Sequence, residues 1–388
     1  MDGDIRFVLL GMAVLSARVG ICLYLCGVSQ SKNAAAAVTR VLADLCVAVL
    51  AYWAVGNAIF LGRLGAVLGR HGSFDAQAFL LATIVPIATG AAIGATLERM
   101  KLLPSLVMSG VLAGIVVPLG MHWAWRGWLH GLGFLDAGGG CFVHLSGGLC
   151  ALAGAAAVGA REGKYNHDGS ANRIPGHNVP LVAAGVLAML IGLLAQILGC
   201  TAVHGAHFIL GAAGEGLLAA AAGGLAGLTL GRVRYATTDF HLTAVGLLGG
   251  VISIAAGAGY FSAAVSVLTG AIGGLLAAWA SVWIDLKRRI DDPASAIAVH
   301  GVAGAWGVMV AALLYFPPFP LVQMLGIAAI GGAALACCSA VYLVFGVAGG
   351  LRVAPADELD GADLAEHDVN AYPDFQQNMI KSHHLRQM

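Results

Sequence analysis

Two histidines recur in the same frame within apolar stretches of the chain. His144 follows Asp136 in "DAGGGCFVHLSGG", and His300 follows Asp292 in "DPASAIAVHGVAG". In both stretches the histidine is the eighth residue after the aspartate and directly follows a valine. A neutral imidazole offers one donor and one acceptor nitrogen, so two such rings together can hold a small weak base. The repeated frame therefore predicts a histidine pair with one chemical role.

The composition around these histidines is that of a protein with many membrane spans. The 388 residues are 59% hydrophobic and only 10% charged, and the mean hydropathy is +0.86. Soluble domains carry about 25% charged residues. The 56 glycines suit close helix packing in lipid. A net charge of zero gives no indication of nucleic-acid binding, and the eight cysteines have no zinc-site spacing.

Apolar stretches of about 20 residues, which is the length needed to cross a bilayer, occur eleven times along the chain. They lie at 5–28, 35–61, 76–97, 102–124, 139–160, 178–200, 206–230, 241–260, 262–285, 294–315 and 321–349. An odd number of spans places the two termini on opposite sides of the membrane. The sequence thus predicts an all-α integral membrane domain over residues 1–350, followed by a tail or linker helix over residues 351–388.

Basic residues predict the orientation of these spans, because cytoplasmic connections are enriched in lysine and arginine. One set of connections contains Lys32, Arg99, Lys101, Arg161, Lys164, Arg173, Arg232, Arg234, Lys287, Arg288 and Arg289. The other set contains only Arg63, Arg70 and Arg126. We therefore expect the N-terminus outside the cell and the C-terminal tail in the cytoplasm.

The two histidine stretches begin spans that run in opposite directions. Asp136 precedes the fifth span and Asp292 the tenth, and an aspartate there can accept hydrogen bonds from the first free amides of the helix. Eight residues place each histidine about 12 Å from its own end of a core about 30 Å thick. Both histidines would reach the middle of the membrane from opposite sides. This arrangement is typical of transporters built from two inverted five-helix halves, here followed by a final helix.

Two further roles for the histidines are weaker hypotheses. A single histidine of this kind is often a core residue with satisfied hydrogen bonds. Two of them in matched frames favour a substrate pathway, because ionisable residues inside a membrane usually mark one. Bis-histidine haem ligation would need histidines paired on the same side of the membrane. We therefore expect no cofactor, no catalytic site and no metal site.

Several motifs across nearly the whole chain resemble the ammonium transporter/Rhesus (Amt/Rh) family. They are "GVSQSKNAA", "LERMKL", "LDAGGGCFVHLSGG", "PGHNVP", "IDLKRRIDDPASAIAVHGVAGAWG" and "LAEHDVNAY". The resemblance implies a homotrimer of eleven-helix protomers with one narrow pore in each protomer. It also implies that His144 and His300 form the pore relay, that Asp136 and Trp125 belong to an outer ammonium site, and that Asp292 has a structural role at a helix start.

The chain departs from the family pattern at the outer end of the implied pore. Alignment on the shared motifs places the two gate phenylalanines of the family at Ile84 and Gln196, and the outer-site serine at Cys200. Isoleucine and glutamine offer no aromatic face to a cation, and a thiol is a weak acceptor. Phe79 and Phe208 are the phenylalanines that could substitute, although neither falls on an aligned position.

Other polar residues carry further expectations. Arg18 and Glu215 are unusual charges within apolar spans, and their pairing would neutralise both. His122, His130, His204 and His207 are expected in the outer loops, without the residue spacing of a metal site. The tail residues Glu366 and Asp368 are candidates for a regulatory contact, and the run after Tyr372 could be a linker helix.

Two functions follow, and neither is enzymatic. The first is ammonium or ammonia transport across the inner (plasma) membrane through a pore with a twin-histidine relay. The alternative is a sensor that binds ammonium without fast conduction and signals through the C-terminal helix to a cytoplasmic nitrogen-regulatory or signalling partner. The changes at Ile84, Gln196 and Cys200 favour the sensor, while a repacked but ordinary transporter explains them equally well. A third option is a structural or inactive homologue.

Overall fold

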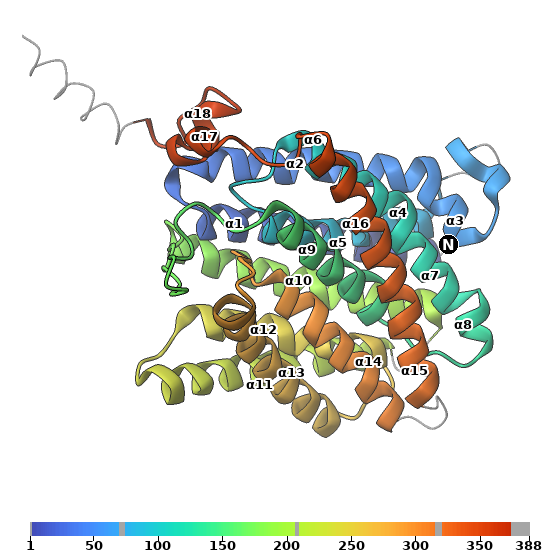
Figure 1. The fold of residues 1–388 in the computed structure, drawn as a ribbon. Helices are drawn as coiled ribbons and strands as arrows, with labels where there is room; N and C mark the ends of the chain where they lie inside the picture. The colour runs from blue at the N-terminus through green and yellow to red at the C-terminus, as the bar shows by residue number, and fades with distance from the viewer. Residues whose placement is uncertain (1, 70–73, 206–208, 315–319, 374–388) are drawn as a thin grey trace, which may run out of the picture.

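The computed structural model of the protein describes residues 2–69, 74–205, 209–314 and 320–373. Within these ranges the chain forms helices and short helical turns and contains no β-strand. Two isolated bridges, between Met100 and Arg352 and between Tyr165 and Ala171, are the extended pairings in this part of the chain. Figure 1 shows that most helices lie side by side with their axes roughly along one direction.

The helices follow the expected apolar stretches closely. They are α1 (Asp2–Val28), α2 (Ala34–Ala51), α3 (Asn57–Leu61), α4 (Ala76–Ile84), α5 (Pro86–Ala95), α6 (Leu102–Val111), α7 (Val117–Trp125), α8 (Trp128–Gly131), α9 (Ser146–Val158), α10 (Val179–His204), α11 (Ile209–Tyr235), α12 (Phe240–Ser253), α13 (Ala263–Trp283), α14 (Ala303–Leu314), α15 (Pro320–Gly326), α16 (Gly332–Val347), α17 (Pro355–Asp360) and α18 (Ala362–Ala365). Several of these are consecutive parts of one span, joined by π-helical turns or, between α4 and α5, interrupted at Pro86, which lacks an amide hydrogen.

Ten helical spans in the described chain are at least 18 residues long and apolar enough to cross a membrane. An eleventh apolar helix, Ile297–Leu313, is shorter than these ten. The predicted all-α membrane fold with eleven spans is thereby confirmed.

The long helix α10 marks the two ends of the molecule. At its start, the amide of Asn178 donates to the carbonyl oxygen of Gly27 in α1 at 3.2 Å. At its end, the ring of His204 lies 6.0 Å from the ring of Trp125. We call the end that contains Phe60, Trp125 and His204 the aromatic end. The opposite end, which contains Glu98, Arg161 and Asp291, is the charged end, and α17 and α18 lie there (Figure 1).

The two histidine helices start from these opposite ends. The carbonyl oxygen of Asp136 accepts a hydrogen bond from the indole of Trp125 at the aromatic end. The side chain of Asp291, next to Asp292, binds Arg161 at the charged end. The helical segments that follow the two aspartates therefore run in opposite directions, as an inverted repeat requires.

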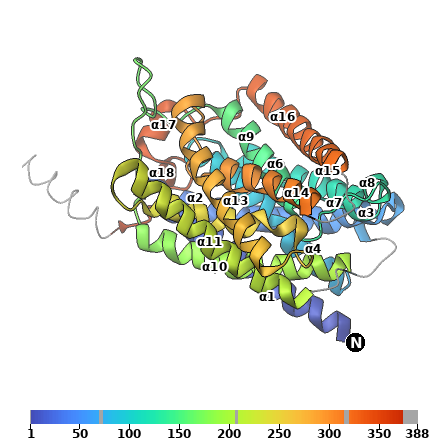
Figure 2. The ribbon, with the colours of Figure 1, turned by 90° about the horizontal axis from the view of Figure 1, so that it is seen from below.

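Glycines let helices approach closely, both between the two halves and within the second half. An added Cβ at Gly20 of α1 would lie 2.6 Å from the carbonyl oxygen of Gly185 in α10. An added Cβ at Gly274 of α13 would lie 2.4 Å from the Cα of Gly223 in α11. Neither position can accept a larger residue without a shift of the backbone, because such contacts are shorter than van der Waals distance. Figure 2 shows α1 beside α10 and α11 beside α13.

Candidate functional site

The two histidines from the repeated frame meet in the interior of the protein. His144 lies in the π-helical turn Gly140–Leu145 that leads into α9, and His300 in the π-helical turn Ile297–Val302 that leads into α14. Their Nδ1 atoms are 2.9 Å apart, and the ring centroids are 5.1 Å apart with an angle of 30° between the planes. His144 is 1% exposed, whereas His300 is partly exposed. The geometry is that of a direct imidazole–imidazole hydrogen bond.

The two aspartates hold the starts of these helical segments. Oδ2 of Asp136 accepts hydrogen bonds from the amides of Cys141 at 2.9 Å and Phe142 at 3.0 Å. Oδ2 of Asp292 accepts one from the amide of Ile297 at 2.7 Å. These amides have no partner within their own helix, so the carboxylates satisfy them. Oδ1 of Asp136 is buried and makes no hydrogen bond to the described residues, which leaves an acceptor for a further N–H group.

Gln196 of α10 contacts the histidine pair directly. Its Oε1 lies 3.1 Å from Nε2 of His144, and its Nε2 donates to the carbonyl oxygen of Gly138 at 2.9 Å. The side chain is fully buried. At the position where the resemblance implies an aromatic gate, the structure therefore has an amide that is hydrogen-bonded to His144.

Aromatic rings form a cluster at the aromatic end. The ring of Trp125 lies 4.8 Å from that of Phe142 and 6.2 Å from that of Phe60, in both cases edge to face. The indole nitrogen donates to the carbonyl oxygen of Asp136 at 2.8 Å, which fixes the orientation of the ring. Tyr260 adds a ring 6.5 Å from His204. Such a cluster can attract a small cation through its π-faces.

One stripe of α10 connects the aromatic cluster with the histidine pair. Gln196, Cys200 and His204 follow at intervals of four residues and so lie on one face of the helix. Gln196 contacts His144, His204 lies beside Trp125, and the fully buried Cys200 lies between them. Ile84 is also fully buried and is the last residue of α4, directly before the break at Pro86. These residues bring the predicted outer site next to the predicted relay.

The expected pairing of Arg18 with Glu215 is wrong. Arg18 instead binds Oδ2 of Asp44 in α2 at 2.5 Å, and it donates to the carbonyl oxygens of Val41 and Pro86. Oε2 of Glu215 accepts a hydrogen bond from the amide of Gly259. Asp44 neutralises Arg18 because α1 and α2 pack together. Asp44 is also a charged residue within an apolar span, but the sequence alone does not show which span lies next to α1.

The remaining sequence expectations are mixed. Phe79 packs against α1 at Gly11, so its ring belongs to a helix–helix contact. Phe208 and His207 lie outside the described residues. The expectation that the outer histidines lie in loops is wrong for His122, His130 and His204, which lie in α7, in α8 and at the end of α10. His122 falls within the expected span 102–124, whereas α10 extends four residues beyond the expected end at residue 200 and so includes His204.

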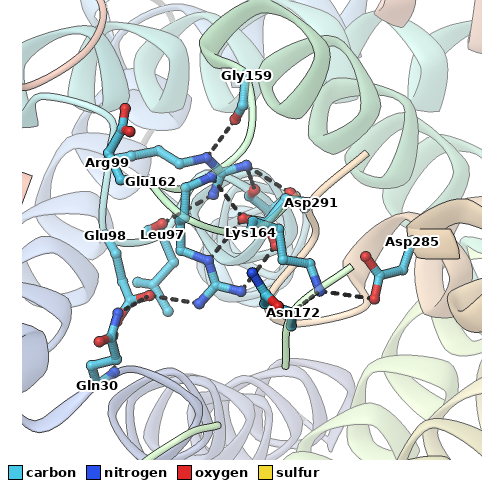
Figure 3. Close-up of polar contacts among 12 residues, drawn as sticks. Gln30, Leu97, Glu98, Arg99, Gly159, Glu162, Lys164, Asn172, Asp285 and Asp291 are labelled. Atoms are coloured by element: carbon cyan, nitrogen blue, oxygen red, sulfur yellow. Dashed lines mark hydrogen bonds and ion pairs between the residues drawn. The ribbon is translucent and has the colours of Figure 1, made fainter. Parts of the chain in front are cut away.

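The charged end contains a buried ion network (Figure 3). The guanidinium of Arg161 binds Glu98 at 2.6 Å and both carboxylate oxygens of Asp291 at 2.8 and 2.9 Å. Arg99, which is completely buried, donates to the carbonyl oxygens of Gly159, Leu97, Ala95 and Asp291. The network joins the loop after α5 and the loop after α9 to Asp291. It thereby holds in place the segment that leads from Asp291 to His300.

The two carboxylates of this network remain ionised. Burial on its own would raise the pKa of Asp291, but the hydrogen bonds and charge of Arg161 hold that pKa at about 2. Burial likewise opposes ionisation of Glu98. The charge of Arg161 and hydrogen bonds from Gln30 and Asn33 nevertheless hold the pKa of Glu98 below its usual value. Both carboxylates of this network therefore have Arg161 as a cationic partner.

The tail docks on the charged end. Asp363 accepts hydrogen bonds from the amides of Ala35 and Ala36 at the start of α2, and Glu366 binds Arg40 at 3.1 Å. Glu358 binds Arg352 at 2.8 Å. Of the two predicted tail residues, Glu366 makes this ion pair, and the side chain of Asp368 makes no hydrogen bond or ion pair with the described residues. Asp363 and Glu358 were missed, because acidic residues in a tail usually face solvent. Residues 374–388, which include most of the predicted linker helix, lie outside the described residues.

Comparison with known proteins identifies the group to which this architecture belongs. The Ammonium Transporter Family matches residues 6–372. Ammonium transporter Amt2 of Archaeoglobus fulgidus is 31% identical over 94% of this chain and 87% of its own length.

Solved structures agree with this match. One described as Sensor Amt Protein has a TM-score of 0.89 and 28% identity, and the alignment covers 94% of this chain and 98% of that one. Mep2 of Candida albicans has a TM-score of 0.80 and 21% identity, with 91% of this chain and 86% of that one covered. The family match over nearly the whole chain, on a fold with the same architecture, shows that the protein belongs to the ammonium transporter family.

Proposed function

We propose that this protein carries ammonium across its membrane through a pore in which His144 and His300 receive the substrate. The observation that carries this proposal is the 2.9 Å contact between the two Nδ1 atoms. The pair lies in the interior of a membrane domain, where an ionisable group usually marks a substrate or proton pathway. No carboxylate among the described residues is hydrogen-bonded to either ring, so both imidazoles are free to remain neutral.

The proposed mechanism starts with capture of the cation at the aromatic end. Removal of an ammonium ion from water costs several kcal/mol or more unless new contacts replace its hydration. The faces of aromatic rings such as Trp125 contribute about 0.5–2 kcal/mol each, and the buried carboxylate of Asp136 provides a negative charge nearby. Deeper in the protein the ion gives up its proton and passes the histidines as neutral ammonia. The proton follows a separate relay along the imidazoles, each of which can accept on one nitrogen and donate from the other.

The orientation, oligomeric state and partner that we propose follow from the same function. The aromatic end faces the outside and the charged end faces the cytoplasm, because basic residues concentrate at the charged end. We infer a homotrimer in an inner membrane. The span Pro320–Val347 is for the most part not buried within one chain, and it leaves a largely apolar face for lipid or for a second copy. The tail at residues 351–388 is the proposed site for a cytoplasmic signalling partner.

A second candidate function is ammonium sensing. It is favoured by the TM-score of 0.89 with the structure described as Sensor Amt Protein, which exceeds the value of 0.80 for Mep2. Ile84 and Gln196 at the implied gate positions also favour it, because neither side chain presents an aromatic face to a passing cation. A sensor of this type would bind ammonium at the aromatic end without passing it quickly.

The experiment that separates the two functions is a transient-current measurement on reconstituted proteoliposomes after an ammonium pulse. A saturable current that is sustained in the wild type and lost in His144→Ala supports transport. Ammonium binding by calorimetry in the absence of any current supports the sensor and contradicts transport. Absence of both binding and current contradicts the two functions together.

A further inference from the structure

The direction of the Gln196 amide is set by its two neighbours. The carbonyl oxygen of Gly138 can only accept, so the NH2 group of Gln196 must be the group that faces it at 2.9 Å. The amide oxygen must then face Nε2 of His144 at 3.1 Å. Gly139, with a φ of 86°, leaves room for this arrangement, since an added Cβ there would lie 3.2 Å from the Gln196 nitrogen. Backbone atoms thus hold the amide in one orientation.

This orientation determines where the protons of both histidines lie. Because the amide oxygen of Gln196 is an acceptor, Nε2 of His144 must carry a hydrogen. A neutral imidazole has one N–H group, so Nδ1 of His144 is an acceptor. Nδ1 of His300, at 2.9 Å, must therefore donate to it. Nε2 of His300 is left with a free lone pair, and no described side chain or backbone group is hydrogen-bonded to it.

We propose that Gln196 is the positioning residue and gate of this pore. Its amide fixes the tautomers of both histidines. It also occupies Nε2 of His144, so that a ligand coming from the aromatic end cannot bind there. Nε2 of His300 is then the single acceptor of the pair for a small ligand with N–H groups, such as ammonia, ammonium or methylammonium. The inference rests on the proposed function for the identity of the ligand, and on the hydrogen-bond geometry alone for the tautomers.

The amide of Gln196 affects both proton transfer and passage of a ligand. An amide neither takes up nor releases a proton near neutral pH, so no proton enters the relay at His144 while Gln196 is in place, and the relay operates only after Gln196 has moved away. A ligand that moves past His144 must first displace Gln196, which breaks the bonds to His144 and Gly138. A leucine at this position fills a similar volume and makes neither bond. Removal of the amide should therefore free Nε2 of His144 and lower the barrier to passage.

The tautomers can be measured in the wild-type protein by 15N NMR of histidine-labelled protein in nanodiscs, with His144→Ala and His300→Ala for assignment. We expect the proton of His144 on Nε2 and that of His300 on Nδ1. In Gln196→Leu, His144 should populate both tautomers. Gln323→Leu is the matched control, because Gln323 is also fully buried but binds Leu135 and Val308, and it should leave the pattern unchanged. A wild-type His144 with its proton on Nδ1, or an unchanged pattern in Gln196→Leu, overturns the proposal.

The gate is tested separately by the ammonium current of the same variants. We expect Gln196→Leu to raise the current about tenfold over wild type, which corresponds to about 1.4 kcal/mol in the barrier. A current in Gln196→Leu that is equal to or below that of wild type overturns the gate. If the tautomers are as expected but no variant binds or passes ammonium, the proposed function fails while the assignment of the tautomers stands.

Discussion

Asp136 and Asp292 begin matching segments of the inverted repeat, yet their surroundings differ. Oδ2 of each aspartate accepts hydrogen bonds from the first free amides of a helical segment that carries one of the two paired histidines. Next to Asp292, the carboxylate of Asp291 is bound by Arg161 through both oxygens. Next to Asp136 there are the rings of Trp125 and Phe142 and no cationic partner among the described residues.

The difference shows how one repeated motif acquires two roles. At the charged end Glu98 and Asp291 are both paired with Arg161, and this network serves to hold the loops. At the aromatic end the carboxyl group of Asp136 is bound by backbone amides and by no cation among the described residues, and π-faces lie beside it. Such surroundings can bind a cation with only a small free-energy penalty. The two halves of the repeat share one motif, but their different surroundings make the two ends of the protein chemically different.

The histidines follow the same division. His144, on the helix that starts at the aromatic end, is bound on both nitrogens, by His300 and by Gln196. His300, on the helix that starts at the charged end, is partly exposed and bound on one nitrogen. Four changes to the protein test this difference between the two ends.

The largest effect is expected from loss of the arginine at the charged end. Arg161→Met leaves Glu98 and Asp291 buried without their cation, and the removal of one partner from such a network costs about 3–5 kcal/mol. Thermal unfolding of the detergent-solubilised protein should show a clearly lower midpoint. Arg173→Met is the matched control, since Arg173 is exposed in the same loop and should change little. Equal stability of the two variants would show that the network does not stabilise the fold.

The same network should respond to acid. The folded pKa of Asp291 is about 2, below the ordinary value of 3.8, so its contribution to stability is complete above about pH 4 and is lost as the pH falls toward 2. This contribution is on the order of 2 kcal/mol. Unfolding midpoints of wild type and Asp291→Asn should therefore differ at pH 6 and converge near pH 2. A difference that is constant over this range would contradict the assignment.

Much of this architecture could be predicted from the sequence, because a membrane limits the solutions. The eleven apolar stretches and the frame from Asp136 to His144 require only a span length and a helical rise. Gln196 was singled out at an aligned gate position, but its bonds to His144 and Gly138 depend on the depth at which α10 packs against the helix of the relay. Apolar packing of this kind carries no periodic signal in the sequence.

The charged residues were harder to place. Arg18 was paired with Glu215 because both are unusual in apolar spans, whereas contact between α1 and α2 brings Asp44 to it instead. The network of Glu98, Arg161 and Asp291 joins short loops that are far apart in the chain, and only the tertiary fold brings them together. Pairing of charges is set by which helices are neighbours, and the sequence pattern does not contain that information.

The unbalanced charge at the aromatic end can be removed with little change of shape. Asp136→Asn keeps an oxygen that accepts from the amides of Cys141 and Phe142 but loses the negative charge. We expect ammonium affinity, measured by calorimetry in nanodiscs, to fall about tenfold, which is about 1.4 kcal/mol. Asp292→Asn is the same change at the other end and should alter affinity by less than about twofold. Equal losses in the two variants would contradict the division between the ends.

The smallest effect concerns Cys200, which lies on α10 between Gln196 and His204. A thiol is a weak acceptor and a hydroxyl is a good one, so Cys200→Ser adds a polar contact for a cation at the aromatic end. Because one additional hydrogen bond contributes about 0.5–1.5 kcal/mol, we expect ammonium to bind about threefold more tightly. Cys46→Ser makes the same replacement at an exposed position of α2 and should leave affinity unchanged. If Cys200→Ser binds no better than Cys46→Ser, the cation does not reach this level of α10, and its site is confined to Trp125 and the rings that surround it.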